Sequence, residues 1–344
     1  MEYSLEPKPL SIAIDPLASG FEDADIQDDA MECRQLRLGP PQHGLRLDRA
    51  LADTVPEFSR SYLQQLIEAG HVALNGRTTR KQSTTVRCDD RLEVSLQPTP
   101  QSTAFKPEAM ALDVVYRDAD VLVINKPAGL VVHPAPGNWS GTLLNGLLAL
   151  DAALLAVPRA GIVHRLDKET SGLMVVARNR AAMDALVAAI AQRSVGREYL
   201  ALAQGRWARG SPWHADRAIG RDPRNRLRMA VVDLSHQPGK AAATDIHLLT
   251  NSDQMCLVRC VLHTGRTHQI RVHMADLGHP LVGDTVYGGR PAAGLAGQAL
   301  HAFRLTFAHP LTAKVLRFEA APPPGFLAAL ASVGLVYNDF PPPG

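Results

Sequence analysis

The sequence predicts an α+β protein, with a mixed, largely antiparallel sheet in a large domain and a small α/β domain before it. The chain has 344 residues, which is enough for two domains. Apolar runs typical of strands outnumber helical patterns and do not alternate with them regularly, which argues against a doubly wound parallel sheet. A segment with prolines and no periodicity separates the early elements from the later ones.

The small domain is expected at residues 45–97. Leu45–Leu51 and Tyr62–Ile67 have the apolar spacing of two helices, and Gly70 is placed to end the second. A strand turning at Asn75–Gly76 follows, and alternating apolar residues at 92, 94 and 96 predict a closing strand. Residues 98–110 form the predicted linker to the large domain.

The first 44 residues are expected to form a disordered acidic leader. Residues 1–30 hold eight acidic residues and one lysine, a charge of −7, which leaves +9 on the other 314 residues of a chain whose total is +2. Few large apolar residues occur in the leader, so it has little to bury. The basic remainder suits a polyanionic partner without identifying one.

The large domain is expected at residues 111–325. Thr142–Leu150 has the pattern of a helix, and Met183, Leu186, Val187 and Ile190 have the spacing of one amphipathic helix lying on the sheet. Strands are predicted at 121–125, 198–204, 242–250, 256–264, 301–307 and 315–320, and residues 126–134 are expected to form a turn that leads into another strand. Residues 326–344 are expected to add a C-terminal helix and a proline-rich tail.

Two polar segments stand out inside this domain. The first, residues 164–171, lies between the apolar runs Ile162–Val163 and Leu173–Ala177, which are expected to be buried strands. Asp167 sits there between Arg165 and Lys168, and these cations would keep its carboxylate ionised. An ordinary solvated loop is the alternative interpretation.

The second segment begins at Thr264. Thr267 can cap a helix in which Ile270, Met274 and Leu277 share the buried face. His268 and Arg271 are three residues apart and so project together. The helix N-terminus, with Arg266 beside it, is a potential anion site.

Other classes of protein are not favoured. We see neither a membrane span nor a secretion signal, and expect the protein in a reducing cytoplasm. Cys256 and Cys260 lie in a strand-like apolar run and are expected in the core. His268 and His273 are five residues apart with no evident acidic third ligand, so we predict no metal site.

The segment His-Arg-Leu-Asp-Lys-Glu-Thr-Ser-Gly-Leu-Met at residues 164–174 resembles the signature of the RluA/RluD family of RNA pseudouridine synthases. The resemblance extends from about residue 45 to residue 320. Residues 125–134 and 280–289 are similar to the RluD branch, and residues 45–97 resemble the S4 RNA-binding domain. The family has a pseudouridine synthase fold in its catalytic domain.

The resemblance implies roles for particular residues. It makes Asp167 the catalytic aspartate, Tyr199 the active-site tyrosine, Arg271 the partner of the aspartate, and Arg165 the arginine inserted where the uridine has left the RNA. Arg197 replaces a lysine that many members have. Further RNA contacts are expected from His164, Lys126, Arg266 and His268, and in the small domain from Arg46, Arg49, Arg60 and Arg77, with Arg80 and Lys81 on the same surface.

The implied reaction breaks the N1–C1′ bond of uridine, turns the base and joins C5 to C1′. It needs no cofactor. An ionised carboxylate must reach the ribose or the base, and a proton must leave C5, for which Tyr199 is the candidate base or relay. Attack of Asp167 on C1′, attack on C6 and removal of a ribose proton all remain open. Taking the base out of its stack costs about a few kcal/mol.

The leading expectation is a monomeric enzyme acting on helix 69 of 23S rRNA. One alternative keeps the reaction but moves it to another 23S site or a tRNA. A second alternative is a ribosome assembly factor with an S4 domain and no catalysis. A hydrolase using Asp167 with His164 is less favoured, because no serine or cysteine nucleophile motif accompanies them.

Overall fold

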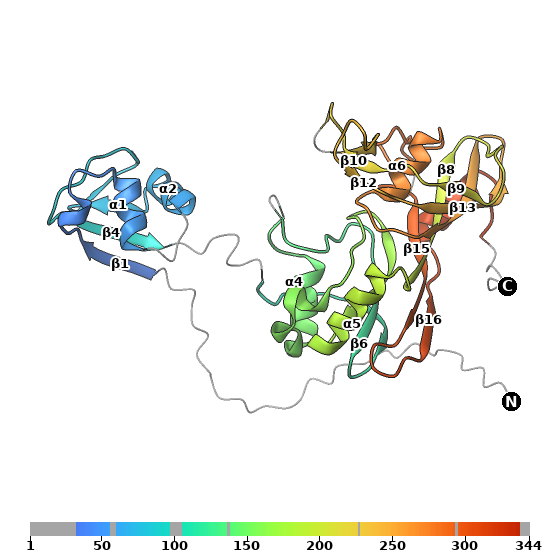
Figure 1. Ribbon diagram of the computed structural model, residues 1–344, viewed down its shortest axis with the longest axis horizontal. Coiled ribbons are helices and arrows are strands. Elements are labelled where there is room, and N and C mark those ends of the chain that lie inside the picture. The colour runs from blue at the N-terminus through green and yellow to red at the C-terminus, as the bar shows by residue number, and fades with distance from the viewer. Residues whose placement is uncertain are drawn as a thin grey trace. The chain divides into compact units, whose positions relative to one another are not determined.

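The computed structural model describes residues 32–55, 60–96, 105–135, 138–225, 228–292 and 295–337 (Figure 1). The described residues up to 96 form one compact unit and those from 105 onward form another. Within the described ranges, no helix combines the length and the apolar character needed to cross a bilayer.

The small unit places two helices, α1 (Leu47–Thr54) and α2 (Arg60–Ala69), against a four-stranded sheet of order β1-β4-β2-β3. Leu47, Leu51, Leu63 and Ile67 from the helices and Leu92 from the sheet are fully buried in one cluster. Its strands are β1 (Glu32–Arg37), β2 (Val72–Leu74), β3 (Arg77–Thr78) and β4 (Arg91–Leu96), and a short 3-10 helix covers Pro40–Gln42.

Strand β1 corrects the predicted domain boundary. It pairs with β4 along its whole length, from Glu32 opposite Leu96 to Arg37 opposite Arg91. The small domain therefore begins before residue 45, within the stretch assigned to the leader. Its polar composition hid the strand, because β1 is an edge strand with few apolar residues. The rest of the predicted leader, residues 1–31, and most of the predicted linker lie outside the described residues.

The large unit is built on a nine-stranded sheet of order β5-β6-β7-β15-β8-β14-β13-β9, with β16 added on β15. Among its described strands, β7 and β15 pair in parallel and the other pairs are antiparallel, which confirms a mixed, largely antiparallel sheet. The strands are β5 (Asp113–Arg117), β6 (Val121–Lys126), β7 (Ser171–Ala177), β8 (Gly196–Gln204), β9 (Trp213–Ala215), β13 (Thr244–Asn251), β14 (Met255–Leu262), β15 (Leu300–Ala308) and β16 (Val315–Glu319).

A smaller sheet of order β11-β10-β12 lies on α6 (Gln269–Asp276), where Val272 packs with Ile219. Its strands are β10 (Ile219–Arg221), β11 (Met229–Val231) and β12 (Gly239–Lys240). The other helices are α4 (Leu143–Leu150), α5 (Arg180–Ala191) and α7 (Pro324–Ser332), with short 3-10 turns at Ala152–Ala156 and Pro158–Gly161.

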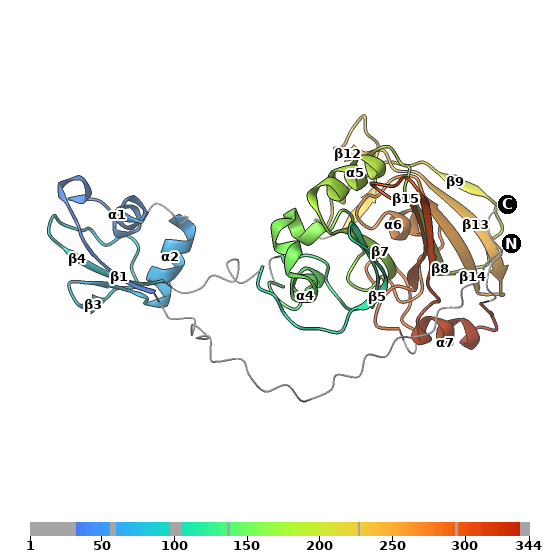
Figure 2. The same ribbon diagram turned by 90° about the horizontal axis from the view of Figure 1, so that it is seen from below.

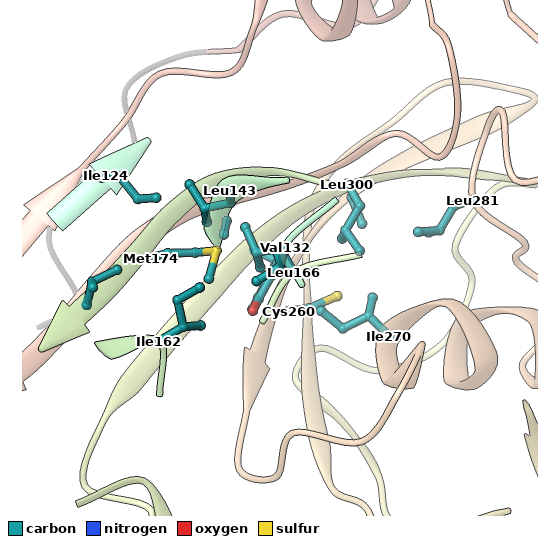
Figure 3. Packing of buried hydrophobic residues seen from close by; sticks show 14 of the residues in the cluster. Ile124, Val132, Leu143, Ile162, Leu166, Met174, Cys260, Ile270, Leu281 and Leu300 are labelled. Atoms are coloured by element: carbon teal, nitrogen blue, oxygen red, sulfur yellow. The ribbon is translucent and has the colours of Figure 1, made fainter. Parts of the chain in front are cut away.

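Successive residues of β6 and β7 serve opposite faces of the sheet, as the alternation of a strand requires. Ile124 and Met174 join the cluster that contains α4 and α6, which Figure 3 shows from close by. Val123 and Val175 join the cluster beneath α5. Cys260 lies in the first cluster, which confirms the core position predicted for both cysteines.

Three local predictions were wrong. The segment 126–134 leads into no strand among the described residues before α4; the carbonyl groups of Val131 and Val132 instead accept hydrogen bonds from the first turn of that helix. Ile162 makes one isolated bridge to Val176 rather than a strand. Val187 of α5 is 46% exposed, because the buried face of that helix centres on Ala182 and Leu186.

Helix α7 confirms the predicted C-terminal helix, and it packs in the core of the large unit. Phe326 and Leu330 are buried against Leu200 of β8 and Phe303 of β15. Figure 2 shows α7 beside these strands. The large unit therefore extends past the predicted end at residue 325.

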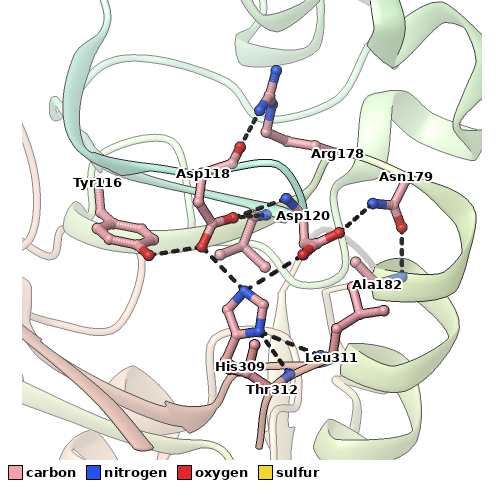
Figure 4. Close-up of polar contacts among 10 residues, drawn as sticks. Tyr116, Asp118, Asp120, Arg178, Asn179, Ala182, His309, Leu311 and Thr312 are labelled. Atoms are coloured by element: carbon pink, nitrogen blue, oxygen red, sulfur yellow. Dashed lines mark hydrogen bonds and ion pairs between the residues drawn. The ribbon is translucent and has the colours of Figure 1, made fainter. Parts of the chain in front are cut away.

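His309, at the end of β15, closes a polar network at one end of the sheet (Figure 4). Its Nε2 lies 3.0 Å from Oδ2 of Asp118, while its Nδ1 accepts the backbone N–H groups of Leu311 and Thr312 at 3.3 and 3.1 Å. Asp120 accepts a hydrogen bond from Asn179, the N-cap of α5, at 2.7 Å. The network joins the β5–β6 turn, α5 and the β15–β16 turn.

In the small unit, Asp48 is a fully buried carboxylate on α1. It accepts hydrogen bonds from Arg46 at 3.0 Å, from Arg60 at 2.8 Å and from Gln64 at 2.7 Å. Burial alone would raise the pKa of Asp48, but these donors outweigh it and hold the pKa well below its usual range. Asp48 therefore ties the start of α1 to α2.

We predict that Asp48→Asn weakens the small unit by about 1–3 kcal/mol, because buried donors lose a charged acceptor. Since the folded-state pKa is depressed, the stabilisation is present at neutral pH and is lost as the pH falls below about 4. Amide hydrogen exchange of residues 47–69 measures both effects, with the exposed Asp53→Asn on the same helix as the control. Equal protection of the two variants across the pH range would contradict the prediction.

Candidate active site

A cleft with a cavity of about 390 Å³ opens in the large unit, and Asp167, Tyr199 and Arg271 all line it. Asp167 lies on the loop before β7, Tyr199 on β8 and Arg271 on α6. The three residues are far apart in the sequence, and the sheet and α6 bring them to the same cavity. The aspartate, tyrosine and arginine that the resemblance assigns to the active site therefore lie in one cleft.

Asp167 and Arg271 form an ion pair. Nη1 of Arg271 lies 3.1 Å from Oδ2 of Asp167, and the side chains are 7% and 18% exposed respectively. The carboxylate thus keeps one side open to the cavity while a nearly buried guanidinium holds the other. The pair is a charge-assisted hydrogen bond, which fixes the position of the carboxylate.

Asp284 holds the other edge of the same guanidinium, and sequence reasoning missed it. Its two oxygens accept from Nε and Nη2 of Arg271 at 2.7 and 2.9 Å, a bidentate pair that is almost completely buried. Burial alone would lower the pKa of Arg271, but the bonds to Asp284 and the charge of Asp167 raise it. The signal was an aspartate next to a glycine in the segment 280–289, which the sequence analysis used only for the resemblance.

His268 also faces the catalytic carboxylate. Its Nε2 lies 3.9 Å from Oδ1 of Asp167, and its Nδ1 lies 2.8 Å from the hydroxyl of Tyr287. Tyr287 in turn accepts the backbone N–H of Met229 at 3.0 Å, and its ring lies against Arg271 with the guanidinium carbon 5.0 Å from the ring centre. Burial lowers the pKa of His268, so the ring is neutral at pH 7. Tyr287 is a second residue that the sequence analysis missed.

The start of α6 differs from its prediction. His268, rather than Thr267, is the N-cap residue, with a left-handed backbone (φ 57°) and no capping side chain. Such a conformation is uncommon for a residue other than glycine, and this one places the imidazole beside Asp167. Gln269 instead holds the turn before the helix, since its Oε1 accepts the backbone N–H of Arg266 at 3.0 Å.

Tyr199 is 6% exposed at the floor of the cleft. Burial raises the pKa of its phenol; the charge of Arg197 opposes this shift and that of Asp167 adds to it. The phenol is therefore protonated at neutral pH. Arg197, the residue in place of the family's usual lysine, lines the same cavity.

His164 and Arg165 differ in their surroundings, because His164 is bound to β7 and Arg165 is exposed. His164 accepts the backbone N–H of Val175 at 3.1 Å through Nε2, and burial lowers its pKa to about 3, so it holds β7 as a neutral ring. Arg165 is exposed and lines this cleft and both neighbouring cavities. Arg266 lines the cleft as well and donates Nε to the carbonyl of Ala241 at 3.0 Å.

The prediction that Lys126 contacts RNA is wrong, because the protein encloses its side chain. It is 1% exposed, and its ammonium donates to the carbonyl oxygens of Pro127, Leu130 and Lys168 at 2.8, 2.9 and 3.0 Å. All three donors of the ammonium are thus used inside the protein. Lys126 ties the loop that carries Asp167 to the segment after β6. Burial lowers the pKa of this lysine to about 8.

The four arginines predicted for the small domain fall into two pairs. Arg46 and Arg60 bind Asp48 while their side chains stay 54% and 52% exposed. Arg49 and Arg77 are exposed on α1 and β3.

His273 of α6 uses both of its ring nitrogens inside the protein. One lies 3.0 Å from the hydroxyl of Thr244 and the other 2.9 Å from the carbonyl oxygen of Arg217.

The chain matches the RNA pseudouridylate synthase family over residues 120–276 and the S4 domain family over residues 45–92. Ribosomal large subunit pseudouridine synthase D from Neisseria meningitidis is 47% identical over 293 residues, covering 81% of this chain and 76% of that protein. A protein of the same name from Haemophilus influenzae is 42% identical over 87% of this chain and 94% of its own length. The uncharacterized RNA pseudouridine synthase YlyB of Bacillus subtilis is 44% identical over 82% and 92%.

Solved structures agree in fold. Human RNA pseudouridylate synthase domain containing 1 superposes with a TM-score of 0.50 at 31% identity, covering 63% of this chain and 86% of that one. Human RNA pseudouridylate synthase domain containing 4 gives 0.53 at 24% identity, a likeness of fold that covers 66% and 95%. With the aspartate, tyrosine and arginine in one cleft and relatives matched over most of their length, this chain belongs to the RNA pseudouridine synthase family and is an isomerase that converts uridine to pseudouridine in RNA.

Proposed function

We propose that Asp167, Tyr199 and Arg271 carry out the isomerisation, and that the substrate is the RNA of the large ribosomal subunit. The observation that supports the catalytic assignment most is the geometry of Arg271. Its guanidinium is nearly buried, bound on one edge by Asp284 and on the other by Asp167 at 3.1 Å. Asp167 is thereby held in place with one side facing the cavity.

Each route open to Asp167 needs this arrangement. Addition to C1′, addition to C6 and removal of a ribose proton all require a charged carboxylate held within reach of one nucleotide. Arg271 supplies charge stabilisation that is organised before the substrate binds. Because the pKa of Tyr199 is raised, its phenol relays the C5 proton while exchanging its own, rather than waiting as a phenolate.

Arg165 has the position expected of the residue that replaces the everted base. It is exposed and borders three adjoining cavities, so its guanidinium can swing between them. Stacking of this planar group on the bases left behind would recover part of the unstacking cost of about a few kcal/mol.

The substrate assignment rests on the relatives and on charge. Two proteins named ribosomal large subunit pseudouridine synthase D match most of the chain, and the S4 match covers residues 45–92. Exposed Arg49 and Arg77, with Arg46 and Arg60, suit contacts to phosphates. Within that RNA we propose the uridines of helix 69. Action as a monomer in the cytoplasm remains a prediction.

We predict that Asp167→Asn lowers turnover by roughly 10³-fold or more, because the amide can act neither as nucleophile nor as base. RNA affinity should stay within about twofold to threefold of wild type. Tritium release from C5-labelled uridine in 23S transcripts measures turnover, and Asp184→Asn, an exposed carboxylate on α5, is the control. If a strain carrying Asp167→Asn alone kept both its pseudouridines and its phenotype, the non-catalytic assembly factor would be the better description.

We predict that Asp284→Asn, a change at a positioning residue, lowers kcat by about 10²-fold with little effect on KM for RNA, because misplacement of a reacting group by about 1 Å has that cost. Asp284→Glu should recover part of the loss, which a purely structural role in the fold would not predict. Thermal unfolding checks that both variants fold. An increase in KM with an unchanged kcat would contradict the assignment.

We predict that deletion of the gene removes pseudouridine from helix 69 and that wild-type protein, but not Asp167→Asn, restores it. Chemical mapping of pseudouridine across 23S rRNA and tRNA gives the answer. Loss confined to other 23S positions or to tRNA would keep the enzyme and overturn the choice of helix 69.

A further inference from the structure

His214, Asp245 and His263 form a cluster that the proposed reaction does not use. They come from β9, from β13 and from the residue just past the end of β14. Asp245 pairs directly with His214 across β9 and β13, and with Val261 across β13 and β14. His263 is two residues beyond Val261, so the three side chains share one face of the sheet.

The three side chains converge on one point. Nδ1 of His214 lies 2.5 Å from Oδ1 of Asp245, and Nε2 of His263 lies 2.7 Å from Oδ2. The candidate ligand atoms of all three residues are within 4.8 Å of one another. The side chains are 57%, 29% and 41% exposed in chain order, so a solute ion can reach them.

A second cluster, Asp118, Asp120 and His309, has one imidazole and two carboxylates and a different hydrogen-bond pattern. Nδ1 of His309 accepts two backbone N–H groups, so Nε2 must carry the ring hydrogen and donate it to Asp118 (Figure 4). A nitrogen that carries a hydrogen cannot bind a metal ion. This cluster is a structural network.

No backbone N–H group of the described residues fixes the tautomer of His214 or His263, in contrast to His309. Among the residues that the structure describes, the hydrogen bonds of both rings go to Asp245. In these two bonds the ring nitrogen that faces Asp245 carries the hydrogen, because a carboxylate can only accept. When an ion arrives, each neutral ring can carry its hydrogen on the outer nitrogen instead, toward water, and the lone pair of the inner nitrogen then binds the ion. Two imidazoles and one carboxylate are a donor set that zinc prefers, with the fourth position left open.

We propose that His214, Asp245 and His263 form a binding site for a divalent transition-metal ion of the zinc type. Ligand atoms in a tetrahedral zinc site are about 3.4 Å apart, given Zn–N distances of about 2.0–2.1 Å. Rotation of exposed side chains on paired strands covers the small difference from the present spacing. The proposal stands independently of the assignments of Asp167 and of the RNA target.

The site would lie at the rim of the catalytic cleft, because His263 is one of the residues that line it. A bound dication would more than balance the charge of Asp245 and add positive charge where a polyanion enters. Water or a phosphate oxygen would fill the open position.

The test is titration of the untagged full-length chain with ZnCl₂ by calorimetry, and with Co²⁺ as a spectroscopic probe. We expect one ion per chain, a visible absorption band of tetrahedral Co²⁺, and at least tenfold weaker binding in both Asp245→Asn and His214→Gln. His236→Gln is the matched control, since His236 is 80% exposed with a single carboxylate 3.9 Å away. It should bind like wild type.

Absence of binding by the wild-type chain, or equal binding by wild type and both cluster variants, would overturn the proposal. A thiolate charge-transfer band with Co²⁺ would place the ion at a cysteine instead, such as the exposed Cys33 or the half-buried Cys88, which also overturns it. Circular dichroism confirms that the two variants fold, and having two of them separates loss of a ligand from damage to the sheet.

Discussion

The catalytic cleft depends on one buried charge, the guanidinium of Arg271. A cation in this position is costly unless opposite charges and hydrogen bonds surround it, and Asp284 supplies both in a bidentate pair. That pair leaves one edge of the guanidinium for Asp167. The ring of Tyr287 covers its face and holds His268 through the phenol. Asp167, His268 and Tyr287 all take their positions from this one group.

The fold brings the parts together through the parallel pairing of β7 with β15. Strand β7 follows the catalytic loop and runs alongside β15, with Gly172 opposite Ala302. Gly172 has a φ of +116°, and a Cβ there would lie 2.3 Å from the carbonyl oxygen of Ala302. Only glycine permits that approach. The end of the loop is thus set against the centre of the sheet, beside the strand that neighbours Tyr199.

Much of this could be predicted from the sequence because periodic and capping signals are local. The pattern of residues 142–150 predicted α4, and an alternating pattern predicted β4. The misses have physical causes. The role of Asp284 could not be predicted, because it depends on Arg271, a partner 13 residues away that only the fold brings close. Lys126 was misjudged because a lysine beside a polar loop usually faces water, and here backbone carbonyls enclose it. Strand β1 lacked apolar alternation.

Asp48 has a consequence for molecular recognition. Arg46 and Arg60 converge on it, yet half of each side chain remains at the surface. Freezing a long flexible side chain on association costs about 0.5–1.5 kcal/mol. Here that loss of freedom has already occurred during folding, so an incoming anion meets two guanidinium groups with their rotamers selected. The buried carboxylate makes the surface pre-organised, and a binding partner gains affinity without any added contact.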